Sequence, residues 1–128
     1  MADWHGYFNL STYLFENSDG AEGWTRSGVS RSYYACLNLI RKHLEDNYGL
    51  VLNKERSTHV QVKKALEDAV VDTEFSDMPN MLRTLKEYRV SCDYHDSLGM
   101  TLAAIVNKSD ILSSELYALT QKFLEFKR

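Results

Sequence analysis

Apolar residues recur every three or four positions along most of the chain, which is the spacing of one face of an α-helix. The longest such stretch covers residues 22–47, where one side is apolar and the opposite side is polar. The apolar stripe consists of Val29, Tyr33, Leu37, Ile40 and Leu44, and the other side carries Arg31, Tyr34, Asn38, Arg41 and Glu45. The pattern predicts one long amphipathic helix. Gly49 is its expected C-cap, because glycine readily adopts the left-handed conformation that ends many helices.

Four further stretches show the same periodicity and predict four more helices. Their expected ranges are residues 4–17, about 58–72, about 77–96 and about 107–126. The segment 100–106 fits either a helical turn or a short extended piece. The sequence therefore predicts a single all-α domain over residues 1–128, folded as an up-and-down bundle of about five helices.

The expected helix starts follow from capping residues. Ser57 or Thr58 can accept a hydrogen bond from the first turn of one helix, and Asp77 can cap the next. Pro79 falls in the first turn after Asp77, where its missing amide hydrogen costs nothing. Asn107 or Ser109 is the expected start of the last helix. Only one proline in 128 residues agrees with long uninterrupted helices.

Charge and cysteine content narrow the functional classes. The net charge of −3 disfavours a protein that coats nucleic acid through a broad basic face, although a local basic groove is compatible with it. Cys36 and Cys92 are too few for a disulfide framework and are expected to be buried free thiols. The sequence shows neither a signal peptide nor an apolar run long enough to cross a membrane, so a cytoplasmic location and no membrane contact are expected.

Motifs for cofactors and metals are missing from the sequence. It contains no glycine-rich phosphate loop, no dinucleotide fingerprint, no HExxH and no CxxC, and no Glu precedes a His by three positions. We therefore expect no cofactor and no metal. A minor alternative is a metal phosphohydrolase that uses the pair His95-Asp96, for which His59 and Asp110 would have to supply further ligands.

Residues 85–96 hold the densest set of chemically active side chains. Arg89 and Asp93 are four positions apart, so they can form an ion pair on one helical surface. His95 follows Arg89 by six positions, about 120° further around an ideal helix. Spacing alone leaves two interpretations open: a structural ion pair with a histidine at a helix end, or a site that contains Arg89 and His95.

Three segments resemble the HEPN domain family, in particular its small stand-alone members. The run from Arg26 to Ala35 is similar to the Ser-Arg-x-Tyr-Tyr-Ala signature of their second helix. Ser57-Thr-His59 is similar to the start of their third helix. Arg89-Val-Ser-Cys-Asp93-Tyr94 is close to the family pattern Arg-x-x-Ala-Asp-Tyr. The order and spacing of these segments extend the resemblance over nearly the whole chain.

The resemblance implies a HEPN-like homodimer that cleaves RNA without a metal ion. Arg89 and His95 match the family's catalytic pair, in which Arg stabilises the phosphorane and His transfers protons. Supporting or substrate-binding roles are implied for Asp93, Tyr94, Arg31, Tyr34 and His59. The structural alternative is that Arg31 pairs with a carboxylate such as Asp93, that Tyr34 packs between helices and that His59 stabilises the fold. HEPN ribonucleases of this kind act in toxin–antitoxin and antiviral defence systems, some with a nucleotidyltransferase as antitoxin.

The sequence also departs from the ribonuclease pattern. Val90 stands where a polar residue commonly follows the catalytic Arg. Tyr94 precedes His95, whereas the tyrosine modified by nucleotidyltransferase antitoxins often follows the histidine. The order of Tyr94 and His95 thus does not match regulation by tyrosine modification. The alternative function, favoured by Val90 and the net negative charge, is a non-catalytic HEPN module that binds a nucleotidyltransferase or another defence protein.

Overall fold

The computed structural model describes residues 5–6, 8–10, 13, 22–94 and 102–126, and these are helical or lie in connections, with no strand among them. Four long helices follow in the order α2 (Glu22–Asn47), α3 (Thr58–Val70), α4 (Met78–Tyr94) and α5 (Leu102–Glu125). The described residues between 5 and 13 are helical too, so the prediction of an all-helical fold with about five helices is confirmed.

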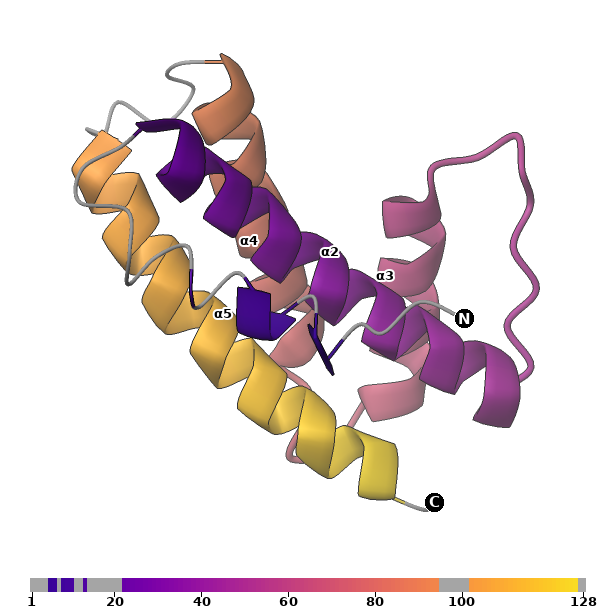
Figure 1. The fold of residues 1–128 in the computed structure, drawn as a ribbon. Helices are drawn as coiled ribbons and strands as arrows, with labels where there is room; N and C mark the ends of the chain where they lie inside the picture. Colours follow the sequence, from indigo (N-terminus) through magenta and orange to yellow (C-terminus); the bar gives the residue numbers. More distant parts are fainter. Residues whose placement is uncertain (1–4, 7, 11–12, 14–21, 95–101, 127–128) are drawn as a thin grey trace.

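Helix α2 packs against α3, α4 and α5 (Figure 1). Helix α4 also packs against both α3 and α5, whereas α3 and α5 do not contact each other. In Figure 1, α2, α3 and α5 run in the same general direction and only α4 runs against them. The prediction of a strict up-and-down bundle is therefore wrong for α2 and α3. The connection 48–57 spans up to ~33 Å when extended, which lets the chain return along α2 before α3 begins.

The core lies between these helices and confirms the predicted apolar stripe of α2. Val29, Tyr33, Leu37, Ile40 and Leu44 are all buried. The polar side that was expected opposite them is only half-buried. The stripe is wider than predicted, because Ala35, Cys36 and Leu39 are buried as well. The other helices supply the residues that meet it: Val62 and Leu66, Met78, Leu82 and Leu85, and Leu116 and Phe123.

Three of the predicted helix ends agree with the structure: both ends of α2 and the start of α3. Helix α2 has the expected bounds, and Gly49 follows it with φ +74°, in the left-handed region. Ser57 caps α3, and its hydroxyl accepts a hydrogen bond from the Val60 amide at 3.4 Å. Pro79 lies in the first turn of α4, as predicted. Helix α3 ends at Val70, before the expected residue, and Asp72 takes a left-handed conformation with φ 60°.

The predicted start of the last helix is wrong. Helix α5 begins at Leu102, so the segment over 102–106 is helical and neither Asn107 nor Ser109 is a cap. Ser109 is fully buried inside the helix, whereas an N-cap serine normally lies at a solvated helix end. The physical reason is packing, because Ile105 lies in a small apolar cluster with Val29 of α2. That contact stabilises the helical conformation of residues 102–106.

Cys36 is buried with a free thiol, as predicted, while the side chain of Cys92 lies outside the described residues. No helix within the described ranges is both long and apolar enough to span a bilayer.

Candidate functional site

Arg89 of α4 lies against two neighbouring tyrosines of α2. Its guanidinium carbon is 5.0 Å from the centre of the Tyr34 ring and 5.8 Å from the centre of the Tyr33 ring. The two rings meet edge to face with their centres 5.0 Å apart. A cation over aromatic faces at this distance is attracted by the ring quadrupoles, more strongly where water is partly excluded. The half-buried Arg89 is thereby fixed in position by the helix that carries the tyrosine pair.

His59 of α3 joins this group through a buried hydrogen bond. Its Nδ1 is 2.8 Å from the hydroxyl oxygen of Tyr33. Burial lowers the pKa of His59 to about 4, and the positive charges of Lys86 and Lys63 contribute to the decrease. Burial also raises the pKa of Tyr33, with a further contribution from Tyr34 and a partial offset from Arg89. Both groups are therefore neutral at pH 7. We call Tyr33, Tyr34, His59 and Arg89 the tyrosine–arginine cluster.

A groove between α3 and α4 borders the tyrosine–arginine cluster. It encloses about 740 Å³, which is within the range of small-ligand sites. His59 lines it from α3 and Val90, the residue after Arg89, lines it from α4. The remaining lining residues are Val60, Lys63, Lys64, Glu67, Arg83, Lys86 and Glu87. We call this hollow the α3–α4 groove.

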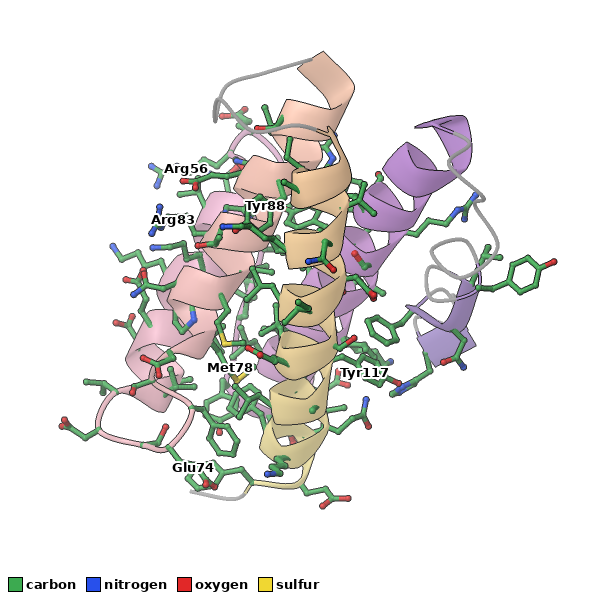
Figure 2. The ribbon with its side chains drawn as sticks, turned by 90° about the vertical axis from the view of Figure 1, so that its left-hand side faces the viewer. Arg56, Glu74, Met78, Arg83, Tyr88 and Tyr117 are labelled. Atoms are coloured by element: carbon green, nitrogen blue, oxygen red, sulfur yellow. The ribbon has the colours of Figure 1, made fainter. Side chains whose placement is uncertain are left out.

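The α3–α4 groove carries excess positive charge, because four cationic side chains face two carboxylates. Both carboxylates are already paired within their own helices: Lys63 with Glu67, and Arg83 with Glu87 at 2.8 Å. Lys64 and Lys86 form no ion pair with a side chain that the structure describes. In Figure 2, Arg56 and Arg83 project from one side of the molecule, so Arg56 adds positive charge on the side of Arg83. A locally basic surface thus exists on a chain whose net charge is −3.

The structure brings together three of the predicted site residues and leaves others apart or undescribed. Arg89, Tyr34 and His59 all belong to the tyrosine–arginine cluster. Arg31 is half-buried on α2, about one turn before Tyr34. Asp93 and Tyr94 form the end of α4, but their side chains lie outside the described residues, as does all of His95. The predicted ion pair between Arg89 and Asp93 therefore stays a prediction.

Sequence reasoning missed Tyr33 and Lys86. Tyr33 was assigned to the core without a functional role; it is indeed buried, yet its hydroxyl is the partner of His59. The available signal was a phenol within an otherwise aliphatic stripe, because a buried hydroxyl needs a hydrogen-bond partner. Lys86 could not be identified from the sequence, since its proximity to His59 depends on how α3 and α4 pack.

The described part of the chain holds no group of three or more His, Cys, Asp or Glu side chains placed to bind a metal ion. His59 and Asp110, which the phosphohydrolase alternative required, lie on α3 and α5, and these helices do not contact each other. The structure therefore does not bring together that pair of metal ligands.

Comparison of the chain with protein-family models, with curated proteins and with solved structures found no match in any of the three. The resemblance to HEPN domains thus rests on the residue motifs.

Proposed function

We propose that the chain is a HEPN-like, metal-independent endoribonuclease that acts as a homodimer in a prokaryotic toxin–antitoxin or antiphage system. The observation that carries the proposal is the placement of Arg89. Its guanidinium is held by Tyr33 and Tyr34, and the next residue, Val90, lines a groove with excess positive charge, which is suited to a phosphate backbone. Arg stays protonated and can donate two parallel hydrogen bonds to phosphate oxygens.

The reaction assigned to this site needs one proton acceptor, one proton donor and positive charge. The ribose 2′-oxygen attacks phosphorus as its proton passes to a histidine, and the bond from phosphorus to the 5′-oxygen breaks as that oxygen receives a proton. Arg89 would stabilise the negative charge on the phosphorane. The products carry 2′,3′-cyclic phosphate and 5′-hydroxyl ends.

His95 is the proposed proton-transfer residue, on the strength of the family spacing after Arg89. An ordinary histidine pKa of about 6.5 suits either proton transfer at neutral pH. One His95 cannot act as acid and base in the same step, whereas a symmetric dimer supplies two. His59 is less suited to the role of acid, because its low pKa keeps it neutral.

The test is cleavage of a labelled RNA in excess EDTA by the wild type, Arg89→Ala and His95→Ala. We expect cleavage by the wild type and a loss of at least ~100-fold in each variant, the usual contribution of a general acid–base group. His5→Ala is the matched control, because His5 is exposed and bonds Tyr117 of α5, away from the groove. Cleavage that survives in His95→Ala, or that EDTA abolishes, would overturn the proposal.

The second candidate is a non-catalytic HEPN-like module that binds a nucleotidyltransferase or another defence protein. The half-burial of Arg89 between α2 and α4 favours it, since a structural arginine also stacks on aromatic rings. This candidate predicts no RNA cleavage at any enzyme concentration and a stable complex with the partner.

A further inference from the structure

We infer that the α3–α4 groove binds the phosphate backbone of a single RNA strand, with one phosphate held between Lys63 and Lys86 beside His59. The inference names the substrate path of the proposed ribonuclease and rests on that function. It can nevertheless be tested separately, because strand binding does not require cleavage.

The first argument is the convergence of charge from two helices. Lys63 lies one turn after His59 on α3, and Lys86 lines the same groove from α4. The positive charges of both lysines also contribute to the lowered pKa of His59, which lines the same groove. Cationic groups on the two walls of a groove that His59 also lines form a suitable site for a phosphate.

The second argument is the dimension of the groove. On α3 it extends from His59 to Glu67, which is ~12 Å at the helical rise. A length of ~12 Å accommodates two to three phosphates of a strand that advances ~3.4 Å or more per nucleotide. Lys64 and Lys86, which form no ion pair with a described side chain, supply contacts for more than one phosphate. A strand can place two or three phosphates in the groove, whereas a mononucleotide cannot.

The third argument is the apolar part of the lining. Val60 is 59% exposed at the groove, and Val90 lies on the opposite helix. These side chains can pack against ribose or base surfaces. Among the described residues, no Phe, Tyr or Trp lines the groove to offer a face on which bases stack, so we expect little sequence preference.

The experiment measures binding of a fluorescent 2′-O-methyl oligouridine of ten nucleotides to the full chain by anisotropy. This probe lacks the nucleophilic 2′-hydroxyl, so it binds without being cleaved. We expect Lys64→Gln/Lys86→Gln to weaken binding about tenfold at 50 mM salt. For single strands, each phosphate contact adds ~0.7 to the steepness of a plot of log binding constant against log salt concentration. The loss of two contacts should therefore make this slope less steep by about 1.4.

Lys122→Gln is the matched control. It removes one positive charge from an exposed position on α5, which does not contact α3. We expect unchanged binding and slope. Equal weakening of oligonucleotide binding by Lys122→Gln and by Lys64→Gln/Lys86→Gln would overturn the inference. So would competition by uridine monophosphate at the oligonucleotide's own concentration, which would indicate a nucleotide pocket.

The two proposals fail in different ways. Normal oligonucleotide binding without RNA cleavage would overturn the ribonuclease alone. RNA cleavage by the wild type, together with unchanged oligonucleotide binding by Lys64→Gln/Lys86→Gln, would overturn the strand path alone.

Discussion

Acidification should destabilise this protein through His59, and the sign follows from its environment. Burial, with Lys86 and Lys63, lowers the pKa of His59 to about 4 in the folded chain. Unfolding exposes the ring to water, where the pKa returns to 6.5. As the pH falls below 6.5, the unfolded state binds a proton that the folded state does not, so the free energy of unfolding decreases until about pH 4.

The expected size is about 2 kcal/mol between pH 7.5 and pH 5. At pH 5 the protonated form of the unfolded ring outweighs the neutral form ~30-fold, and each factor of ten corresponds to ~1.4 kcal/mol. Burial also lowers the pKa of His43, with Asp46 acting in the opposite direction. His43 therefore adds to the acid sensitivity of the whole chain, and the contribution of His59 must be measured as a difference.

The assay is urea unfolding of the wild type and of His59→Gln at several pH values from 7.5 to 5. Glutamine cannot be protonated and retains a side chain that can bond the Tyr33 hydroxyl. The contributions of His43 and the carboxylates are common to both proteins and cancel in the comparison. We expect the wild type to lose about 2 kcal/mol more than the variant over this range. A constant stability difference between the two proteins at all pH values would refute the reasoning.

Three further predictions concern the fold and its buried groups. Tyr33→Phe leaves the buried His59 without its hydroxyl partner and should cost about 1–3 kcal/mol in urea unfolding; no measurable loss would show that this hydrogen bond contributes little. Gly49→Ala should cost about 1–2 kcal/mol, because Gly49 has φ +74°, where a side chain strains the backbone. No atom of the described residues lies within 4 Å of the new Cβ, so backbone strain is the expected cause; an unchanged melting temperature would contradict this argument. Burial raises the pKa of Cys36 to about 12, so peptide mapping after thiol labelling at pH 8 should find Cys36 unmodified in the folded chain and modified in urea.

The helices were largely predictable because their signals are local. The bounds of α2 follow from a long apolar stripe and from Gly49, and the start of α3 follows from Ser57. The start of α5 was not predictable, because an apolar run such as 102–106 fits a buried helix or a strand equally well. Its contact between Ile105 and Val29 joins residues far apart in the sequence. The direction of α3 relative to α2 was also missed, since it depends on the path of a ten-residue connection.

The candidate site was predictable in its residues but not in its arrangement. Arg89, Tyr34 and His59 were selected by motif, while their meeting depends on the packing of α2 against α3 and α4. Helical periodicity assigned Tyr33 correctly to the core, yet periodicity cannot tell whether a buried hydroxyl bonds a side chain on another helix. The charge of the α3–α4 groove was hidden for the same reason, because its cations come from two separate segments of an acidic chain.

The tyrosine–arginine cluster connects the stability of the fold to the proposed site. Lys63 and Lys86 disfavour a proton on His59, and their charges are also what would attract a phosphate to the groove. A phosphate between these lysines would offset their charge, so RNA binding would raise the proton affinity of His59. By reciprocity, protonation of His59 would then strengthen phosphate binding by the same factor. The hydrogen bond between His59 and Tyr33 connects this coupling to the ring that Arg89 contacts.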